Sequence, residues 1–204
     1  MNYNIASFGV NHYNQHMSTI YLFRHGQSEF NLTKTFTGWL DAKLTPLGIE
    51  QAKNLGEMLK DKKIDLAYTS RLSRAQDTLK EVLAFHPECR ETIVDDRMIE
   101  RSYGDLSGQT HADVIAKYGQ EQFDKWHRGW SDNTKNGESF ADVEVRVSQF
   151  IADLKAKYSG QDLGIAISAH GNSIRLFRKI MENATVEDCV SWTIPYDQYF
   201  QYEI

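Results

Sequence analysis

The sequence predicts an α/β protein with three layers, α/β/α, around a mostly parallel β-sheet. Apolar, strand-like runs at 19–23 and 164–168 each end at a His-Gly turn that leads into a helical segment. Segments with strand and helix character alternate along the chain without an internal repeat. At 204 residues, the chain is also long enough for one such domain with a sizeable core. We therefore expect parallel strands with helices on both faces.

The first long helix follows the 19–23 strand. Thr45 suits the N-cap and Pro46 the first helical position, and the helix should run to about Lys60. Its inward positions are Ala52, Leu55 and Leu59. Residues 64–68 then have the composition of a short strand.

A second helix should follow that strand, capped by Ser70 and extending toward Pro87. Its apolar residues keep helical spacing at Leu72, Ala75, Leu79 and Val82. Residues 91–95 are a further candidate strand.

The later part of the chain contains an expected insertion at about 105–137, in which residues 109–130 form one or two helices. Ser139 to Asp142 resembles a capping box and opens a long helix to about Tyr158. Residues 199–204 alternate in polarity, which predicts an edge strand that can run antiparallel to its neighbour.

Composition restricts the classes of function. The net charge of −5 argues against a nucleic-acid or anionic-membrane binder, and no apolar run is long enough to span a bilayer. Two cysteines form no disulfide framework, and the N-terminus lacks a secretory pattern, so we expect a cytoplasmic protein. Residues 1–16 are interpreted as an extension and 17–204 as a single catalytic domain.

Charged and polar side chains follow three of the expected strands. In a parallel sheet the ends at Arg24-His25, at Ser70 and at His170 should lie on one edge, where α/β proteins bind ligands. Arg74 stands one turn into the helix after Ser70 and can point back to that edge. The sequence therefore predicts a small anion site made of two arginines and two histidines.

This set of residues fits phosphoryl transfer. An imidazole nitrogen can attack phosphorus and leave again, and arginines can stabilise the charge of the transition state. A carboxylate is also needed to transfer the proton of the ester oxygen. Glu100 follows the 91–95 strand and is the best candidate.

The chain resembles the histidine phosphatase superfamily, and within it the cofactor-dependent phosphoglycerate mutases. Five segments between residues 19 and 200 carry the resemblance and occur in the family's order. These segments are 24–31 (RHGQSEFN), 37–45 (TGWLDAKLT), 70–75 (SRLSRA), 100–104 (ERSYG) and 169–173 (AHGNS).

The resemblance implies a phosphoglycerate mutase-like fold and an enzyme that interconverts 3-phosphoglycerate and 2-phosphoglycerate. His25 would carry the phosphoryl group, held by Arg24, Arg74 and His170, and Glu100 would transfer the proton. The implied substrate contacts are Ser28, Asn31, Thr37, Gly38, Arg101, Tyr103, His111, His127, Arg128, Gly171 and Asn172. The reaction would use 2,3-bisphosphoglycerate as a primer and no metal, with a small phosphorylated metabolite as partner and a homodimer as one implied assembly.

The chain departs from the mutase pattern at several positions, among them residues 130–136, which replace a usual proline run. Ser102 replaces a usual His, His111 a usual Lys, and His127 the first Arg of a usual pair with Arg128. Neutral histidines would lower the affinity for a doubly charged substrate. This favours a second hypothesis, a phosphatase for small phosphoesters. A third hypothesis, a catalytically silent binder of phosphorylated partners, is disfavoured because the full set of reactive residues is present.

A few further residues receive structural interpretations. Arg101, Arg175 and Arg178 are expected as surface or helix-face charges, although Arg101 is kept as a candidate contact because it adjoins Glu100. Trp39 and Trp126 are assigned equally to packing of the insertion and to the site.

Overall fold

The computed structural model describes residues 17–204, so the predicted extension at 1–16 lies outside the described residues. The sheet is built from β1 (Thr19–Arg24), β2 (Leu66–Thr69), β3 (Glu91–Val94), β4 (Gly164–Ala169) and β5 (Tyr199–Glu203). Their order is β3-β2-β4-β1-β5. All neighbouring strands pair in parallel except β5, which runs antiparallel to β1 at the edge. The predicted three-layer α/β fold is confirmed.

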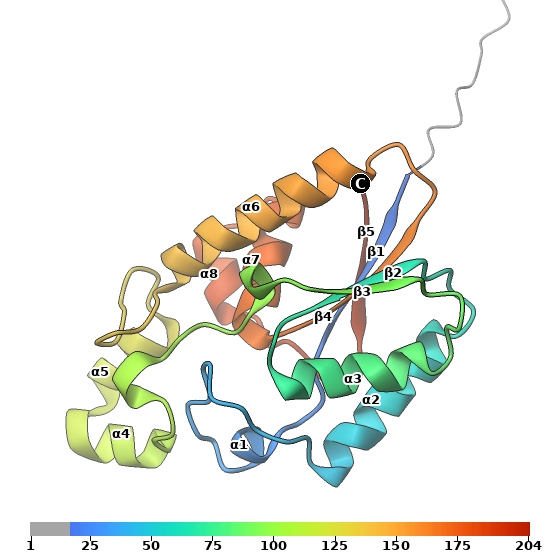
Figure 1. Ribbon diagram of the computed structural model, residues 1–204. Coiled ribbons are helices and arrows are strands. Elements are labelled where there is room, and N and C mark those ends of the chain that lie inside the picture. The colour runs from blue at the N-terminus through green and yellow to red at the C-terminus, as the bar shows by residue number, and fades with distance from the viewer. Residues whose placement is uncertain (1–16) are drawn as a thin grey trace, which may run out of the picture.

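Helices cover both faces of the sheet (Figure 1). α2 (Pro46–Leu59) and α3 (Ser73–Leu83) lie on one face, and α6 (Phe140–Tyr158), α7 (Gly171–Glu182) and α8 (Val186–Ser191) on the other. Alternate residues of β1 enter the two cores, since successive strand side chains point to opposite faces. Tyr21 and Phe23 pack in the α2–α3 core, and Ile20 and Leu22 in the α6–α7 core.

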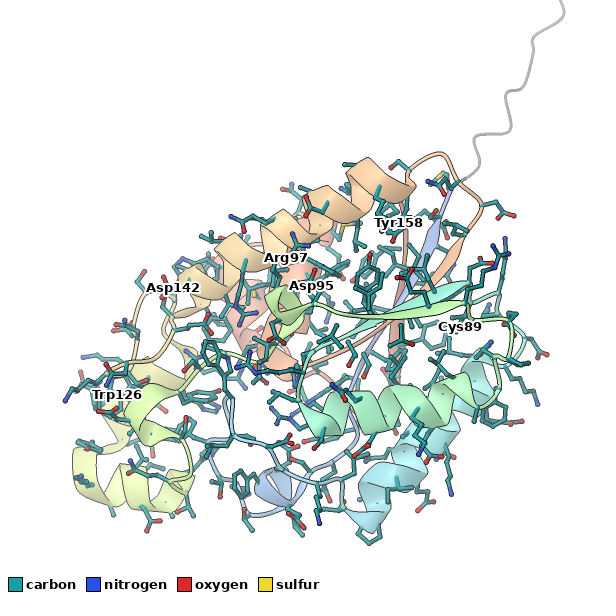
Figure 2. All side chains as sticks on the ribbon, in the orientation of Figure 1. Cys89, Asp95, Arg97, Trp126, Asp142 and Tyr158 are labelled. Atoms are coloured by element: carbon teal, nitrogen blue, oxygen red, sulfur yellow. The ribbon has the colours of Figure 1, made fainter. Side chains whose placement is uncertain are left out.

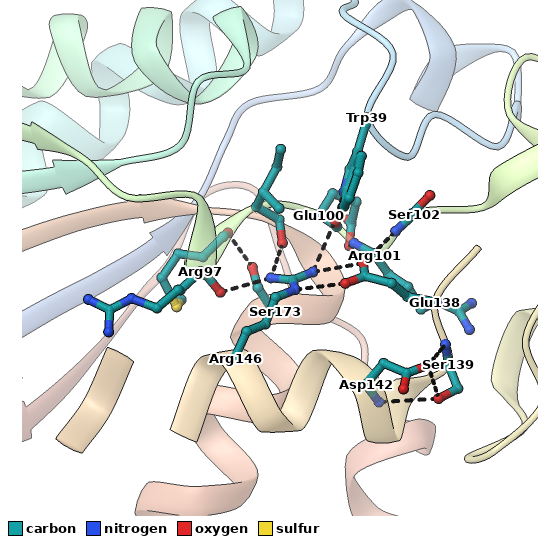
Figure 3. A network of polar contacts seen from close by, with 12 residues as sticks. Trp39, Arg97, Glu100, Arg101, Ser102, Glu138, Ser139, Asp142, Arg146 and Ser173 are labelled. Atoms are coloured by element: carbon teal, nitrogen blue, oxygen red, sulfur yellow. Dashed lines mark hydrogen bonds and ion pairs between the residues drawn. The ribbon is translucent and has the colours of Figure 1, made fainter. Parts of the chain in front are cut away.

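The helix caps agree with the sequence at two places and differ at a third. Thr45 Oγ1 accepts a hydrogen bond from the Gly48 N–H at 3.0 Å. Ser139 forms its capping box with Asp142, which Figure 2 labels at the start of α6 and Figure 3 shows with its contacts. Ser70, however, does not cap α3. The N-cap is Leu72, and the Ser70 hydroxyl instead lies 2.7 Å from His170 Nε2. The hydroxyl also accepts a hydrogen bond from the Leu72 N–H at 3.3 Å, just before the helix, and α3 ends at Leu83, short of Pro87.

The insertion contains two helices, α4 (His111–Tyr118) and α5 (Gln120–Arg128), preceded by the 3₁₀ turns η1 (Asp96–Met98) and η2 (Gly104–Leu106). It has a small core of its own, formed by Phe36, Tyr103, Leu106, Val114 and Phe123. Because Phe36 follows the short helix α1 (Glu29–Leu32), this core joins the insertion to the loops beyond β1. Figure 1 shows α1, α4 and α5 together on one side of the sheet.

The carboxyl ends of β2, β4 and β1 are neighbours in the sheet, which brings Ser70, His170 and His25 to one edge. The turn after His25 packs tightly on α2, where a Cβ on Gly26 would lie 2.1 Å from the Gly48 carbonyl oxygen. Only glycine permits this close approach. No helix within residues 17–204 has the length and apolar character of a membrane span.

Candidate active site

His25 is a buried, neutral imidazole with one nitrogen free to react. Its Nδ1 lies 2.7 Å from the Gly26 carbonyl oxygen, which can only accept, so Nδ1 carries the proton. Nε2 therefore keeps its lone pair and accepts a hydrogen bond from Arg74 Nε at 3.2 Å. Burial, reinforced by the charges of Arg74 and Arg24, lowers the pKa of His25 well below its usual value. Nε2 can thus act as a nucleophile at neutral pH.

Arg74 reaches the site from the first turn of α3 and is 1% exposed. Besides His25, its guanidinium binds a neighbouring loop, with Nη1 donating to the Leu40 carbonyl and Nη2 to the Gly38 carbonyl, each at 3.0 Å. Arg74 therefore fixes the loop at 38–40 against the histidine.

His170 is fully buried, and its ring centroid lies 5.0 Å from that of His25. Burial, together with the charges of Arg74, His25 and Arg24, lowers the pKa of His170 well below its usual value. Its Nδ1 has no hydrogen-bond partner within residues 17–204, and the same holds for the buried Nε of Arg24. Arg24 is positioned by the Ile194 carbonyl and by the ring of Tyr196. Unpartnered buried nitrogens on two residues around one nucleophile indicate a site for an anion.

Only one of the two His-Gly turns is followed directly by a long helix. α7 begins at Gly171, immediately after His170, and its N-terminal N–H groups face the site region through Asn172. The helix after His25, α1, begins only at Glu29 and has a single turn. Of the two turns, only the one at His170 therefore places a long helix's N-terminus, which favours anions, directly beside the histidine.

Glu100 is 8% exposed and lines a cleft together with Arg24 and Gly171, the chain neighbours of His25 and His170, whereas the two histidines do not line it themselves. Its Oε1 accepts hydrogen bonds from the Arg101 N–H at 2.8 Å and from the Asn172 N–H at 3.1 Å. Two backbone donors orient the carboxyl group from two elements, the loop after η1 and the start of α7. A carboxylate held in this way can serve as acid and base beside a phosphoryl site.

The cleft has a volume of about 260 Å³, which suits a small metabolite. Most of the predicted contacts line it, namely Asn31, Thr37, Gly38, Tyr103, His111, His127, Arg128, Gly171 and Asn172. Ser28 and Arg101 do not. The Ser28 hydroxyl is buried and forms the capping box of α1 with Asn31, and buried Arg101 donates to the carbonyls of Trp126 and His127.

Two cations in the cleft were not assigned to it from the sequence, Lys34 and Arg175. Arg175 is 8% exposed rather than a surface charge, and it donates to Asn172 Oδ1 at 3.0 Å and to the Trp192 carbonyl at 2.9 Å. Its place one helical turn after Asn172 is the signal that could have found it. Arg178 is a helix-face charge as expected, paired with Glu182.

Like charges gather in this cleft. Burial, followed by the charges of Arg128 and Arg24, lowers the pKa of Arg175 to about 9. Burial also lowers the pKa of Arg128, with Arg101 and Arg24 contributing in the same direction. Arginines held near one another in a buried cleft are the arrangement that binds phosphate or carboxylate.

His111 and His127 do not supply charge to this cleft. Burial lowers the pKa of His127 to about 3, with Arg128 and His111 adding to the effect. Burial, with the charges of Lys34 and Arg128, also lowers the pKa of His111. The two rings lie 5.2 Å apart, and both pack beside Phe36. They form a neutral aromatic wall of the cleft, and the positive charges of this part of the cleft come from Lys34, Arg128 and Arg175.

The two tryptophans have different roles. Trp39 Nε1 donates to the Glu100 carbonyl at 2.7 Å, so this residue contacts the site. Trp126 packs within the insertion, against the ring of Tyr118.

Within the described part of the chain, no group of three or more His, Cys, Asp or Glu side chains is arranged to hold a metal ion. Independence of metal stays a prediction.

Comparison with known proteins agrees with this chemistry. The family model for the histidine phosphatase superfamily, branch 1, matches residues 20–200. The chain belongs to the histidine phosphatase superfamily. A curated relative from Rhizobium rhizogenes is 42% identical over 178 residues, covering 85% of this chain and 83% of its own length. Another from Rhizobium meliloti is 43% identical, covering 83% and 82%. Both are named 2,3-bisphosphoglycerate-dependent phosphoglycerate mutase.

Solved structures of the superfamily add a second activity to the comparison. A protein titled mycobacterial hydrolase 1 superposes with a TM-score of 0.81 at 26% identity, covering 92% of each chain. A mycobacterial glucosyl-3-phosphoglycerate phosphatase superposes with a TM-score of 0.78 at 26% identity, covering 91% of this chain and 89% of its own. The chain is therefore an enzyme of the histidine phosphatase superfamily. The proteins to which it is similar include some named as mutases and some named as phosphatases.

Proposed function

We propose that this enzyme is a 2,3-bisphosphoglycerate-dependent phosphoglycerate mutase, which interconverts 3-phosphoglycerate and 2-phosphoglycerate. The observation that carries the proposal is the second group of cations, Lys34, Arg128 and Arg175, in the cleft that Arg24 and Glu100 also line. A ligand with two anionic groups needs two cationic sites, whereas hydrolysis of a monoester needs one. The names of the curated relatives support the same reaction.

In the first half of the proposed cycle, the phosphoryl group is on His25 Nε2 and 3-phosphoglycerate occupies the cleft. The 2-hydroxyl oxygen attacks phosphorus while Glu100 takes the hydroxyl proton, and the P–N bond breaks as its electrons return to Nε2. Arg74 Nε, which lies 3.2 Å from Nε2, and Arg24 stabilise the transferring oxygens. The product of this step is 2,3-bisphosphoglycerate.

In the second half, the bisphosphate presents its 3-phosphoryl group to His25. Nε2 attacks that phosphorus, the bond to the 3-oxygen breaks, and Glu100 returns its proton to the departing oxygen. The product is 2-phosphoglycerate, and the phosphohistidine is restored. A trace of 2,3-bisphosphoglycerate supplies the first phosphoryl group by the same step.

A phosphatase for small phosphoesters is the second candidate. The neutral state of His111 and His127 favours it, because these residues replace cations of the mutase pattern and add no charge. The solved hydrolase and phosphatase structures favour it as well. In this reaction water would take the place of the glycerate hydroxyl in attacking the phosphohistidine.

One experiment separates the two candidates. The purified protein is incubated with 3-phosphoglycerate, with and without a trace of 2,3-bisphosphoglycerate, and both 2-phosphoglycerate and inorganic phosphate are measured. Formation of 2-phosphoglycerate that depends on the primer supports the mutase. Inorganic phosphate as the main product would refute it, and the variant His25→Ala controls for contaminating enzymes.

The proposal also covers the cellular compartment, the partner and the assembly of the enzyme. We infer a cytoplasmic enzyme whose partner is a small phosphorylated metabolite, and a homodimer as its assembly. Light scattering of the purified chain measures the assembly, and a monomeric mass would exclude the homodimer.

A further inference from the structure

The loop that carries Glu100 is held in place by side chains from other elements. Residues 99–103 belong to no helix or strand, so their backbone groups need partners from outside the segment. The largest number of such partners comes from one side chain, Arg146 on α6. Figure 3 shows its guanidinium among the carbonyl groups of this loop.

All five N–H groups of Arg146 are used. Nη1 donates to the carbonyls of Arg97 and Ile99, each at 2.8 Å, and Nη2 donates to the Glu100 carbonyl at 3.1 Å. The remaining Nε and Nη2 groups donate to the two carboxylate oxygens of Glu138 at 3.0 and 3.1 Å. A guanidinium has five donors, so this one has none left for a ligand.

Glu138 binds the backbone that follows Glu100 in the chain. Its Oε2 accepts from the Ser102 N–H at 2.9 Å, and its own N–H donates to the Ser102 carbonyl at 2.9 Å. The Arg146 and Glu138 side chains are 15% and 19% exposed, so water screens this bidentate pair only partly. The pair thus binds the backbone both before and after Glu100.

The Glu100 carbonyl has a second donor, Trp39 Nε1 at 2.7 Å. Trp39 belongs to the loop that Arg74 fixes through the carbonyls of Gly38 and Leu40. The Glu100 peptide is therefore fixed between α6 on one side and the loop at 38–40 on the other.

We propose that Arg146, oriented by Glu138, is the positioning residue that sets the Glu100 carboxyl group for proton transfer. The inference rests on the acid–base role of Glu100 in the proposed function, and it applies to a mutase and to a phosphatase alike. Lysine cannot replace the guanidinium here, because one ammonium group cannot reach three carbonyls and a carboxylate in the same plane.

The chemistry of the leaving group provides a test that a merely structural role would not pass. An alkyl phosphate releases a strongly basic oxygen, which needs a proton from Glu100 as the P–O bond breaks. p-Nitrophenyl phosphate releases a stable phenolate, which departs without that proton. Displacement of Glu100 should slow transfer from the alkyl donor selectively, whereas loss of folded protein slows both donors equally.

The experiment measures the single-turnover rate of phosphohistidine formation from 2,3-bisphosphoglycerate and from p-nitrophenyl phosphate. In Arg146→Lys we expect the first rate to fall roughly 10²-fold, the cost of about 1 Å of misplacement, and the second to change by less than about 3-fold. Glu100→Gln should show the same selectivity more strongly. Glu138→Gln should also lower the ratio of the first rate to the second, and this variant tests the proposal if Arg146→Lys does not fold.

Arg97→Met is the matched control. Arg97 pairs with Asp95 at 2.7 Å (Figure 2) and joins this region to α6 through Asp153 at 2.5 Å, but its side chain makes no hydrogen bond to the Glu100 carbonyl. In Arg97→Met the ratio of the two single-turnover rates should equal that of the wild type. Equal losses for both donors in Arg146→Lys, or no loss, would overturn the proposal. A wild type that forms phosphohistidine but no 2-phosphoglycerate would refute the mutase and leave this ratio measurable, so the two failures are distinguishable.

Discussion

The buried histidines should make the stability of this protein depend on pH between 5 and 8, and His127 allows the size of the effect to be calculated. Burial holds the pKa of its side chain at about 3 in the folded chain, against an ordinary value of 6.5. Below pH 6.5 the unfolded chain binds a proton that the folded chain does not. The free energy of unfolding therefore decreases as the pH falls, and His127 alone accounts for about 2 kcal/mol between pH 8 and pH 5.

His25 and His170 should contribute in the same direction. Burial lowers both pKa values well below the ordinary range, so each folded side chain resists a proton that the unfolded chain accepts. The free energy of unfolding should therefore decrease further than His127 alone requires as the pH falls. The contribution of His127, about 2 kcal/mol, is already a noticeable share of the 5–15 kcal/mol that is typical of a domain.

Urea unfolding at several pH values between 5 and 8 tests this reasoning with two variants, His127→Phe and His127→Gln. Neither new side chain titrates, so the stability of both variants should fall about 2 kcal/mol less than that of the wild type between pH 8 and pH 5. Differences in packing shift each curve by an amount that does not depend on pH. Curves that run parallel to the wild type would show that His127 binds its proton equally in the folded and the unfolded chain, and would refute the argument.

Four further outcomes are expected. His25→Ala should give no phosphoenzyme after incubation with labelled 2,3-bisphosphoglycerate, and label in that variant would place the nucleophile elsewhere. Glu100→Gln should reduce turnover of phosphoglycerate by roughly 10²–10⁴, and a wild-type rate would mean that another group transfers the proton. Activity should survive dialysis against a chelator, whereas its loss and recovery with metal would overturn the histidine mechanism. Because the pKa of His127 is about 3, its titration should leave substrate affinity level from pH 6 to 8, and affinity that declines across this range in the wild type but not in His127→Gln, by calorimetry, would show that it binds as a cation.

Local patterns predicted the sheet and most helix boundaries because the forces that fix them act between neighbours in sequence. The capping box of Ser139 and Asp142 is complete within four residues, and the structure contains it. Ser70 had the same local potential. Its hydroxyl contacts His170, one hundred residues away, and no sequence pattern near Ser70 predicts that contact.

The same distinction applies to the site. His25 and His170 could be placed together because each ends a strand, and the ends of neighbouring parallel strands must meet. Arg146 could not be placed, since its partners include backbone carbonyls such as that of Ile99, which every residue possesses. The protonation state of His127 also required the structure, because it depends on burial rather than on residue type.

The neutral wall of the cleft bears on how one site could carry out both halves of a mutase cycle. In the proposed reaction the bisphosphate must exchange its two phosphoryl groups between His25 and the cations Lys34, Arg128 and Arg175. A third cationic centre between these sites would hold the ligand in one orientation and slow that exchange. Uncharged His111 and His127 beside Phe36 bind neither phosphoryl group as an ion pair. Their substitution for cations therefore remains compatible with the mutase, provided that the permanent charges hold the intermediate while it turns.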